Sequence, residues 1–174
     1  MALLNDIRAL DKDAVSELAF DAGPVPAVKP IDIGRVTRLI NRIRARHDAD
    51  AVVFDKQLAA LAMEHCLMMA TNGRVTNSFG PGTGLRSRLA AAGLRGVGAE
   101  SVGAGHSTVD SLFQDWSHRR GHRENIVHAR MTHFGFAAAT NPLSRYRAYW
   151  TLILFRPSSG YLHTDPIAQS DSTV

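Results

Sequence analysis

Cysteine is nearly absent from the sequence: Cys66 is the only one in 174 residues, so no disulfide bond can form within the chain. Cys66 lies in an apolar helical stretch, where we expect a buried, unreactive thiol. No run of about 18 apolar residues occurs, which excludes a transmembrane helix. Residues 1–20 carry acidic side chains and lack the apolar centre of a signal peptide. We therefore expect either a cytoplasmic protein or a mature form from which an export signal has been removed.

Lysine is scarce as well, so arginine supplies most of the 20 basic side chains. The formal net charge is +4 and the pI is about 9.7. This modest excess of positive charge favours anionic surfaces such as lipid headgroups or wall polymers. No basic stripe interleaved with aromatic residues is present, so the sequence predicts no nucleic-acid partner.

The signatures of several enzyme classes are also missing. The glycine-rich loop at residues 80–84 lacks the lysine and serine or threonine of a P-loop, so we interpret it as a turn. No Gly-x-Ser-x-Gly motif occurs, and Cys66 lies within a helix rather than at an exposed turn. The sequence gives no support to a serine or cysteine hydrolase.

What is present indicates one globular domain, because 45% of the residues are hydrophobic and 21% are charged. We assign residues 1–34 to an N-terminal extension or linker that ends in a proline-rich stretch. Residues 35–156 form the domain, and residues 157–174 form a C-terminal tail.

Apolar residues at helical spacing predict four helices. The first spans residues 33–46, and the second spans residues 56–72, with Asp55 as its N-cap and Gly73 at its end. A short third helix covers residues 85–92. The fourth is capped by Ser107 or Thr108 and is broken by Gly121.

The C-terminal third is aromatic and β-branched, which is typical of strands. Residues 133–139 and 148–155 are separated by a turn-rich segment, and this arrangement predicts an antiparallel hairpin. The second strand is apolar on both faces, so we expect it at the centre of a sheet with helices on each side.

Short motifs follow one another along the chain: residues 89–94 (LAAAGL), 99–102 (AESV), 121–126 (GHRENI), 132–136 (THFGF) and 149–150 (YW). This ordered series, over about residues 35–155, resembles the bacterial branch of the CAP superfamily (cysteine-rich secretory proteins, antigen 5 and pathogenesis-related 1; also called the SCP domain). The resemblance implies an α+β fold, a three-layer α-β-α sandwich with a central, mainly antiparallel sheet. The hydrophobic pattern alone favours the same layers.

The resemblance also implies a cleft with two histidines and two acidic residues, which holds a divalent metal in some family members. Glu100 and His122 match one residue of each kind, both in segments that we predict as glycine-bounded loops. Asn77 stands where the other histidine is expected, and the second acidic position falls in His118-Arg119. The predicted cleft residues are Asn77, Glu100, His118, His122, Arg123 and Asn125.

An amide oxygen is a poor ligand for zinc, so His122 is a candidate metal ligand only if another group completes the site. That group could be His65, His106 or His118. In the alternative without a resident cofactor, Glu100 and His122 hydrogen-bond each other or the backbone and brace the cleft. The arginines around His122 could bind phosphate or carboxylate, or could be paired with Glu124 or Asp115.

Two functions follow, and whether the protein is an enzyme stays open. The first is a non-catalytic binding module, secreted, periplasmic or in the cell envelope, for a lipid, a wall fragment or another protein. The second is a metal-assisted hydrolase with Glu100 as base and His122 as ligand of an ion such as zinc. A cytoplasmic scaffold is a further alternative, suggested by the missing signal peptide.

Overall fold

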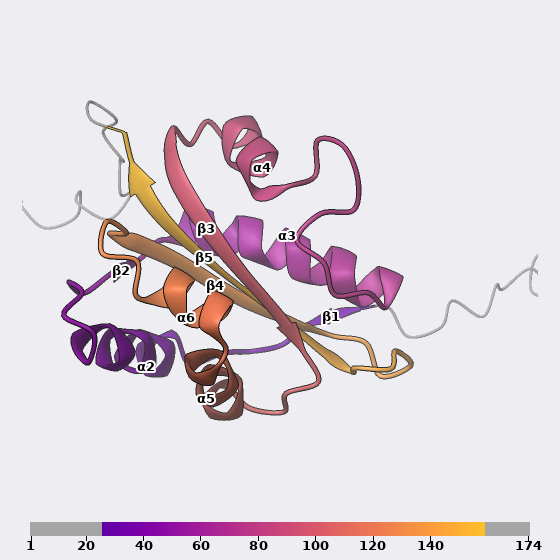
Figure 1. The fold of residues 1–174 in the computed structure, drawn as a ribbon. Helices are drawn as coiled ribbons and strands as arrows, with labels where there is room; N and C mark the ends of the chain where they lie inside the picture. The colour runs from indigo at the N-terminus through magenta and orange to yellow at the C-terminus, as the bar shows by residue number, and fades with distance from the viewer. Residues whose placement is uncertain (1–25, 159–174) are drawn as a thin grey trace, which may run out of the picture.

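The computed structural model describes residues 26–158, in which a sheet lies between two layers of helices (Figure 1). Residues 1–25 and 159–174, which hold the region tested for a signal peptide and most of the assigned tail, lie outside the described part. Five strands form one sheet in this part of the chain: β1 (Ala27–Val28), β2 (Val53–Phe54), β3 (Gly96–Ala104), β4 (His133–Thr140) and β5 (Ala148–Pro157). The strand order is β1-β4-β5-β3, with β2 paired to β4. Only the β2–β4 pair is parallel, so the sheet is mainly antiparallel.

Strand β5 is the centre of the sheet, between β4 and β3, as its apolar sequence predicts. Its side chains alternate between the two faces. Trp150, Leu152 and Leu154 pack in one core, and Ile153 and Phe155 pack in the other. The predicted hairpin of β4 and β5 is confirmed, with Thr140 opposite Ala148 next to the turn.

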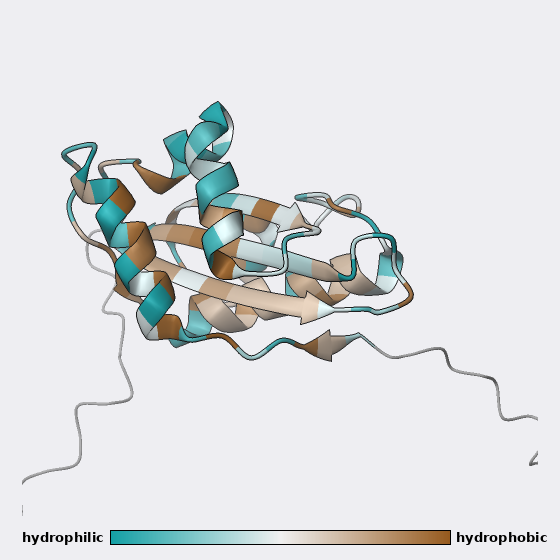
Figure 2. Cartoon of the chain, turned by 90° about the horizontal axis from the view of Figure 1, so that it is seen from below, coloured by the Kyte–Doolittle hydropathy of each residue, from teal (hydrophilic) through white to brown (hydrophobic). Residues whose placement is uncertain are grey.

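Helices cover both faces of the sheet. On one face lie α3 (Lys56–Asn72) and α4 (Leu85–Ala91); on the other lie α2 (Ile33–Ala45), α5 (Val109–His118) and α6 (Arg120–Ile126). In Figure 2, hydrophobic residues run along the strands, while hydrophilic and hydrophobic residues alternate along the helices. The predicted three-layer α-β-α sandwich is therefore confirmed. Among the described residues, no helix is long and apolar enough to cross a membrane.

Helix α3 begins and ends where the sequence predicts. The Asp55 carboxylate accepts a hydrogen bond from the Leu58 amide at 2.8 Å, and Gly73 ends the helix with a φ of 60°. Cys66 is fully buried on this helix, and its thiol lies 3.2 Å from the Thr151 hydroxyl. Burial raises the pKa of the thiol to about 12, which is the unreactive state that we expect from the sequence.

Two segments that we predicted as loops are regular structure. Glu100 lies in strand β3, where it pairs with Ile153 of β5. His122 lies in α6, and Gly121, predicted to break a helix, is the second residue of that helix. The break falls instead at Arg119, whose extended backbone (φ −89°, ψ 117°) separates α5 from α6.

The chain just before α2 belongs to the sheet. Ala27 and Val28 pair with the outer edge of β4, and the Lys29 amide donates to the Ala138 carbonyl at 2.9 Å. The Lys29 ammonium donates to the Ser107 carbonyl at 2.7 Å. Part of the segment that we assigned to an extension is thus attached to the domain, while the boundary at residue 35 stays a prediction.

Arg44 is a fully buried cation on α2 that fixes the chain after α6. Its guanidinium donates to the carbonyls of Ile126 at 2.7 Å, His128 at 3.2 Å and Met131 at 3.2 Å. A further bond of 2.6 Å reaches the Asp50 carbonyl, and burial lowers the pKa of the guanidinium. The Ile126 carbonyl at the end of α6 is thereby satisfied from the neighbouring helix.

Candidate functional site

A cleft of about 730 Å³ opens at the β3 edge of the sheet, between the loop after α3 and helix α6. It is lined by Asn77, Glu100, Arg119, Arg120, Gly121, His122, Glu124 and Asn125. Four of the six predicted cleft residues therefore come together here. The lining contains no aliphatic or aromatic hydrocarbon side chain, so the cleft is suited to polar ligands.

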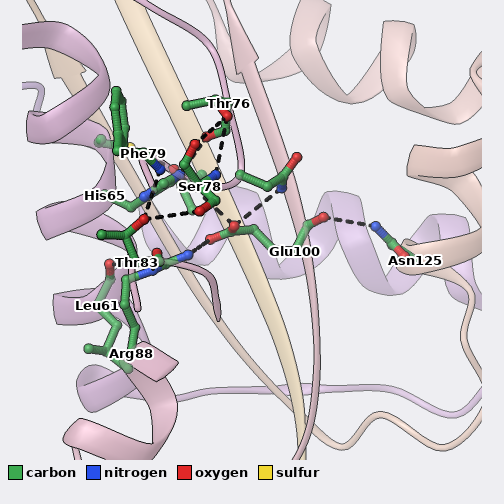
Figure 3. A network of polar contacts seen from close by, with 12 residues as sticks. Leu61, His65, Thr76, Ser78, Phe79, Thr83, Arg88, Glu100 and Asn125 are labelled. Atoms are coloured by element: carbon green, nitrogen blue, oxygen red, sulfur yellow. Dashed lines mark hydrogen bonds and ion pairs between the residues drawn. The ribbon is translucent and has the colours of Figure 1, made fainter. Parts of the chain in front are cut away.

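Glu100 is the most buried carboxylate of the cleft, with 3% of its side chain exposed. Arg88 of α4 donates to one of its oxygens at 2.6 Å (Figure 3). Asn77 donates to the other oxygen at 3.2 Å. His65 of α3 lies 4.0 Å from the same second oxygen. The carboxylate is thus neutralised by a buried guanidinium and joins α4 to the Asn77 loop.

The loop that carries Asn77 is held by its own hydroxyl groups. The Thr83 hydroxyl accepts a hydrogen bond from the Phe79 amide at 2.8 Å and lies 3.0 Å from the Ser78 hydroxyl. Arg88 donates to the Thr83 carbonyl at 3.1 Å, so the residue that pairs with Glu100 also fixes this loop (Figure 3).

His65 is a fully buried imidazole beneath the loop. Burial lowers its pKa, the nearby Arg88 lowers it further, and Glu100 acts in the opposite direction. In the neutral ring, Nε2 donates to the Thr76 carbonyl at 2.7 Å, while Nδ1 has no partner within residues 26–158. His65 therefore contributes to the fold as an uncharged group.

We expect the free energy of unfolding to fall as the pH is lowered below about 6.5, the ordinary pKa of histidine. Because the pKa of His65 is lower in the folded protein, the unfolded chain binds the proton first, and folding loses up to about 1.4 kcal/mol per pH unit until the folded-state pKa is reached. Urea unfolding at several pH values measures this slope. The slope should decrease in His65→Gln and stay unchanged in His47→Gln, which alters an exposed histidine after α2. Equal slopes in His65→Gln and the unmodified protein would contradict the assignment.

His122 presents a flat ring to the cleft. Its imidazole stacks on buried Trp116, with ring centroids 5.3 Å apart and planes inclined by 24°. Burial lowers its pKa and Arg119 lowers it further, while Asp115 raises it. His122 is therefore a neutral ring braced from behind by an aromatic side chain.

Asn125 connects α6 to the edge of the sheet. Its amide donates to the Glu100 carbonyl at 2.9 Å and to the Ser101 hydroxyl at 3.2 Å. Asn125 thus joins a helix to a strand. Glu100 and His122 thus sit on opposite walls of the cleft, held together through Asn125.

The arginines near His122 are paired with acidic side chains, which is one of the two alternatives that the sequence left open. Arg119 pairs with Asp115 at 2.9 Å, and Arg120 pairs with Glu124 at 2.7 Å. These pairs are exposed and weak, so both guanidiniums can exchange partners with an anionic ligand.

The two other predicted cleft residues do not line it. His118 is exposed at the end of α5, where Nδ1 lies 2.7 Å from the Gln114 carbonyl. Arg123 points to the Ser117 carbonyl at 3.4 Å.

The model of the cysteine-rich secretory protein family, CAP, matches residues 37–154. This match covers most of the chain and agrees with the sandwich fold. The chain belongs to the CAP family. Comparison with curated proteins found no match.

Solved bacterial structures share the fold of this CAP domain. An extracellular protein of Bacillus anthracis that contains an SCP domain is 25% identical, with a TM-score of 0.61. The match covers 71% of this chain and 39% of the Bacillus chain. An outer surface protein of Borrelia burgdorferi is 14% identical, with a TM-score of 0.65. The match covers 75% of this chain and 99% of the Borrelia chain. A cysteine-rich secretory protein of Staphylococcus aureus is 20% identical, with a TM-score of 0.54. The match covers 70% of this chain and 37% of the Staphylococcus chain. The chain therefore spans well under half the length of the Bacillus and Staphylococcus proteins.

The donor groups of this CAP cleft do not fit a divalent metal. Glu100 is paired with the Arg88 guanidinium, and the amide of Asn77 faces that carboxylate with its NH₂ group. Within residues 26–158, no group of three or more His, Cys, Asp and Glu side chains could hold an ion. His106 and His118, weighed as completing ligands, do not line the cleft, and Nε2 of His65 is engaged by Thr76. A cation would have to displace Arg88 from a buried site.

Arg88, the residue that pairs with Glu100, was not among the predicted cleft residues. Arg88 lies in a short arginine-bearing helix, in which a guanidinium is expected to be exposed. One feature of the sequence could have predicted the pair. No acidic residue occurs from position 65 to position 99, so Glu100 is the first carboxylate after the helix that carries Arg88.

Proposed function

We propose that this CAP domain is a non-catalytic binding module whose cleft around Glu100 and His122 takes a polar, anionic fragment of the cell wall. The observation that carries the proposal is the buried ion pair of Glu100 and Arg88, with 2.6 Å between nitrogen and oxygen. A carboxylate held in this way is a poor general base, since it already accepts strong hydrogen bonds.

The remaining lining supports a polar ligand. Arg119 and Arg120 supply exposed guanidiniums, which bind carboxylate and phosphate with two parallel hydrogen bonds. His122 supplies a neutral ring on which a sugar face can lie. A lipid tail finds no apolar wall here, so a lipid headgroup or a protein surface are the other candidates.

We further propose that the protein acts outside the cytoplasm, in the envelope or as a secreted protein. The Bacillus anthracis protein with the same domain is described as extracellular, which supports this location. The absence of cysteine pairs makes the domain independent of an oxidising compartment.

Co-sedimentation with purified bacterial cell wall tests the proposal. We expect binding at low salt that weakens at high salt, and a loss of about tenfold in affinity in Arg119→Ala/Arg120→Ala. His122→Ala should also weaken binding, whereas His47→Ala, which alters an exposed histidine outside the cleft, should not. Urea unfolding of each variant separates lost binding from lost folding.

Two results would reject this function. One is the absence of binding to cell wall at low salt in the folded protein. The other is a metal adduct in native mass spectrometry that a chelator removes and that His122→Ala abolishes. The second result would favour the metal-assisted hydrolase with Glu100 as base.

A further inference from the structure

A second groove, of about 810 Å³, lies along the same sheet edge between α4 and the first residues of β3. Its walls include the apolar side chains of Leu85, Leu89 and Leu94, and its rim carries Arg86 and Arg95. It shares no lining residue with the Glu100 cleft. The groove thus combines an apolar floor with basic sides, which the Glu100 cleft does not.

The backbone of β3 presents to this groove hydrogen-bonding groups that have no partner in the described part of the chain. In an antiparallel pair, the N–H and C=O of a residue point together toward one side, and the side alternates along the strand. The Glu100 carbonyl points away from β5, because Asn125 binds it from outside, while the Arg95 carbonyl points toward β5, where Ser158 binds it. Gly96 and Gly98 have the same parity as Glu100, so their N–H and C=O groups face outward.

Two glycines make this edge accessible. A Cβ atom on Gly98 would lie 2.8 Å from the end of Leu89, so the glycine lets α4 lie directly on the strand. Without side chains at residues 96 and 98, the outward backbone groups have no cover from their own residues. Asn125 occupies the edge only from Glu100 onward. Within residues 26–158, the edge at residues 96–98 is unpaired, and another chain can add to a strand edge of this kind.

The charge around the groove is positive and uncompensated. From residue 65 to residue 99 the chain has four arginines and no acidic residue. Arg88 is paired with Glu100, whereas Arg86 and Arg95 are exposed and form no ion pair within the described residues. An occupant with carboxylates beside the strand would complement both guanidiniums.

We propose that the groove between α4 and β3 binds an extended, acidic peptide segment of a partner protein, which adds to the sheet as a strand beside Gly96 and Gly98. Its apolar side chains fill the space over Leu85 and Leu89, and its carboxylates meet Arg86 and Arg95. A hydrocarbon chain would cover the outward N–H and C=O groups without bonding them, which is unfavourable for each buried group. A peptide strand bonds these groups, which is why a peptide is favoured over a lipid tail.

Fluorescence anisotropy with labelled ten-residue peptides tests this site. We expect a peptide of alternating glutamate and valine to bind about tenfold more tightly than one of alternating lysine and valine. A fully N-methylated glutamate-valine peptide, which has no N–H donors, should lose about tenfold or more in affinity. Binding should also slow hydrogen exchange at the Gly96 and Gly98 amides, observed by NMR.

Charge reversal at the rim provides the matched control. Arg86→Glu/Arg95→Glu should lose about tenfold in affinity for the glutamate-valine peptide. Arg42→Glu/Arg130→Glu makes the same change in net charge at two exposed arginines outside the groove and should change it less than about twofold. His122→Ala should leave peptide binding unchanged, which separates this site from the proposed wall-binding cleft.

Three outcomes would overturn the proposal: no binding of the glutamate-valine peptide, equal binding of its N-methylated form, or equal losses in the two double variants. If instead vesicles of phosphatidylglycerol bind through Arg86 and Arg95 while the peptides do not, the groove is a lipid site and the peptide proposal is wrong.

Discussion

Replacing Arg44 by methionine should lower the free energy of unfolding by about 3–5 kcal/mol, a large share of the stability of a domain of this size. The guanidinium is fully buried and donates to the carbonyls of Asp50, Ile126, His128 and Met131. Methionine fills much of the space but donates nothing, so four carbonyls lose this donor. The bonds to Ile126 and Met131 are buried, while the His128 carbonyl still accepts from the Met131 amide. Removing a buried charge offsets part of this cost. The expected loss in the free energy of unfolding is therefore smaller than the sum of four hydrogen bonds.

Urea unfolding measures this loss as a lower midpoint with an unchanged slope. Arg42→Met is the matched control, because Arg42 is exposed on the same helix and its loss should change stability by less than about 0.5 kcal/mol. The loss of stability in Arg44→Lys should lie between those of Arg44→Met and Arg42→Met. An ammonium group still donates hydrogen bonds, but it has fewer donors than a guanidinium and lacks its planar geometry. A loss below about 1 kcal/mol in Arg44→Met would show that other groups satisfy these carbonyls.

The elements that the sequence predicts well carry their own local signals. Helix α3 has an acidic N-cap, a glycine end and one apolar stripe, and all three agree with its observed bounds. The hairpin of β4 and β5 is rich in aromatic and aliphatic residues, and its burial on both faces follows from that pattern. Such segments were predicted because local preference and tertiary packing favour the same structure.

Strand β3 was missed because its sequence has little intrinsic preference for a strand. Glycine occupies residues 96, 98 and 103, and glycine, alanine and glutamate are all depleted in strands. Nine residues of β3 nevertheless pair in regular register with β5. Pairing with a central apolar strand thus overrides local preference, and that pairing is not visible in the segment itself.

Only part of the cleft lining, and not its chemistry, could be predicted from the sequence. The family resemblance implied a cleft of six residues, and the structure brings four of them together: Asn77, Glu100, His122 and Asn125. The resemblance could not show that Glu100 is paired with Arg88, because that contact depends on how α4 packs against β3. The packing of α4 against β3 brings Arg88 to Glu100 and also forms the groove lined by Leu85, Leu89 and Gly98.

Removing Arg88 should expose how much the fold depends on that ion pair. Arg88→Met leaves the Glu100 carboxylate buried without its cation, and we expect a loss of about 3–5 kcal/mol in the free energy of unfolding. Glu100→Gln alone should cost less, since an amide can still accept a hydrogen bond from Arg88. In the double variant Arg88→Met/Glu100→Gln no unpaired charge remains, so stability should return to within about 1–2 kcal/mol of the original protein.

The four proteins form a double-mutant cycle, in which the coupling between the two side chains should be about 2–3 kcal/mol. Arg86→Met is the control on the same helix: Arg86 is exposed and unpaired within residues 26–158, so its loss should be nearly neutral. If the losses in Arg88→Met and Glu100→Gln simply add, the pair contributes nothing to folding. Glu100 would then be free to act on a ligand or a proton, and the non-catalytic cleft would lose its main support. Strong coupling instead means that this CAP domain uses its most buried carboxylate to hold α4 and the Asn77 loop in place.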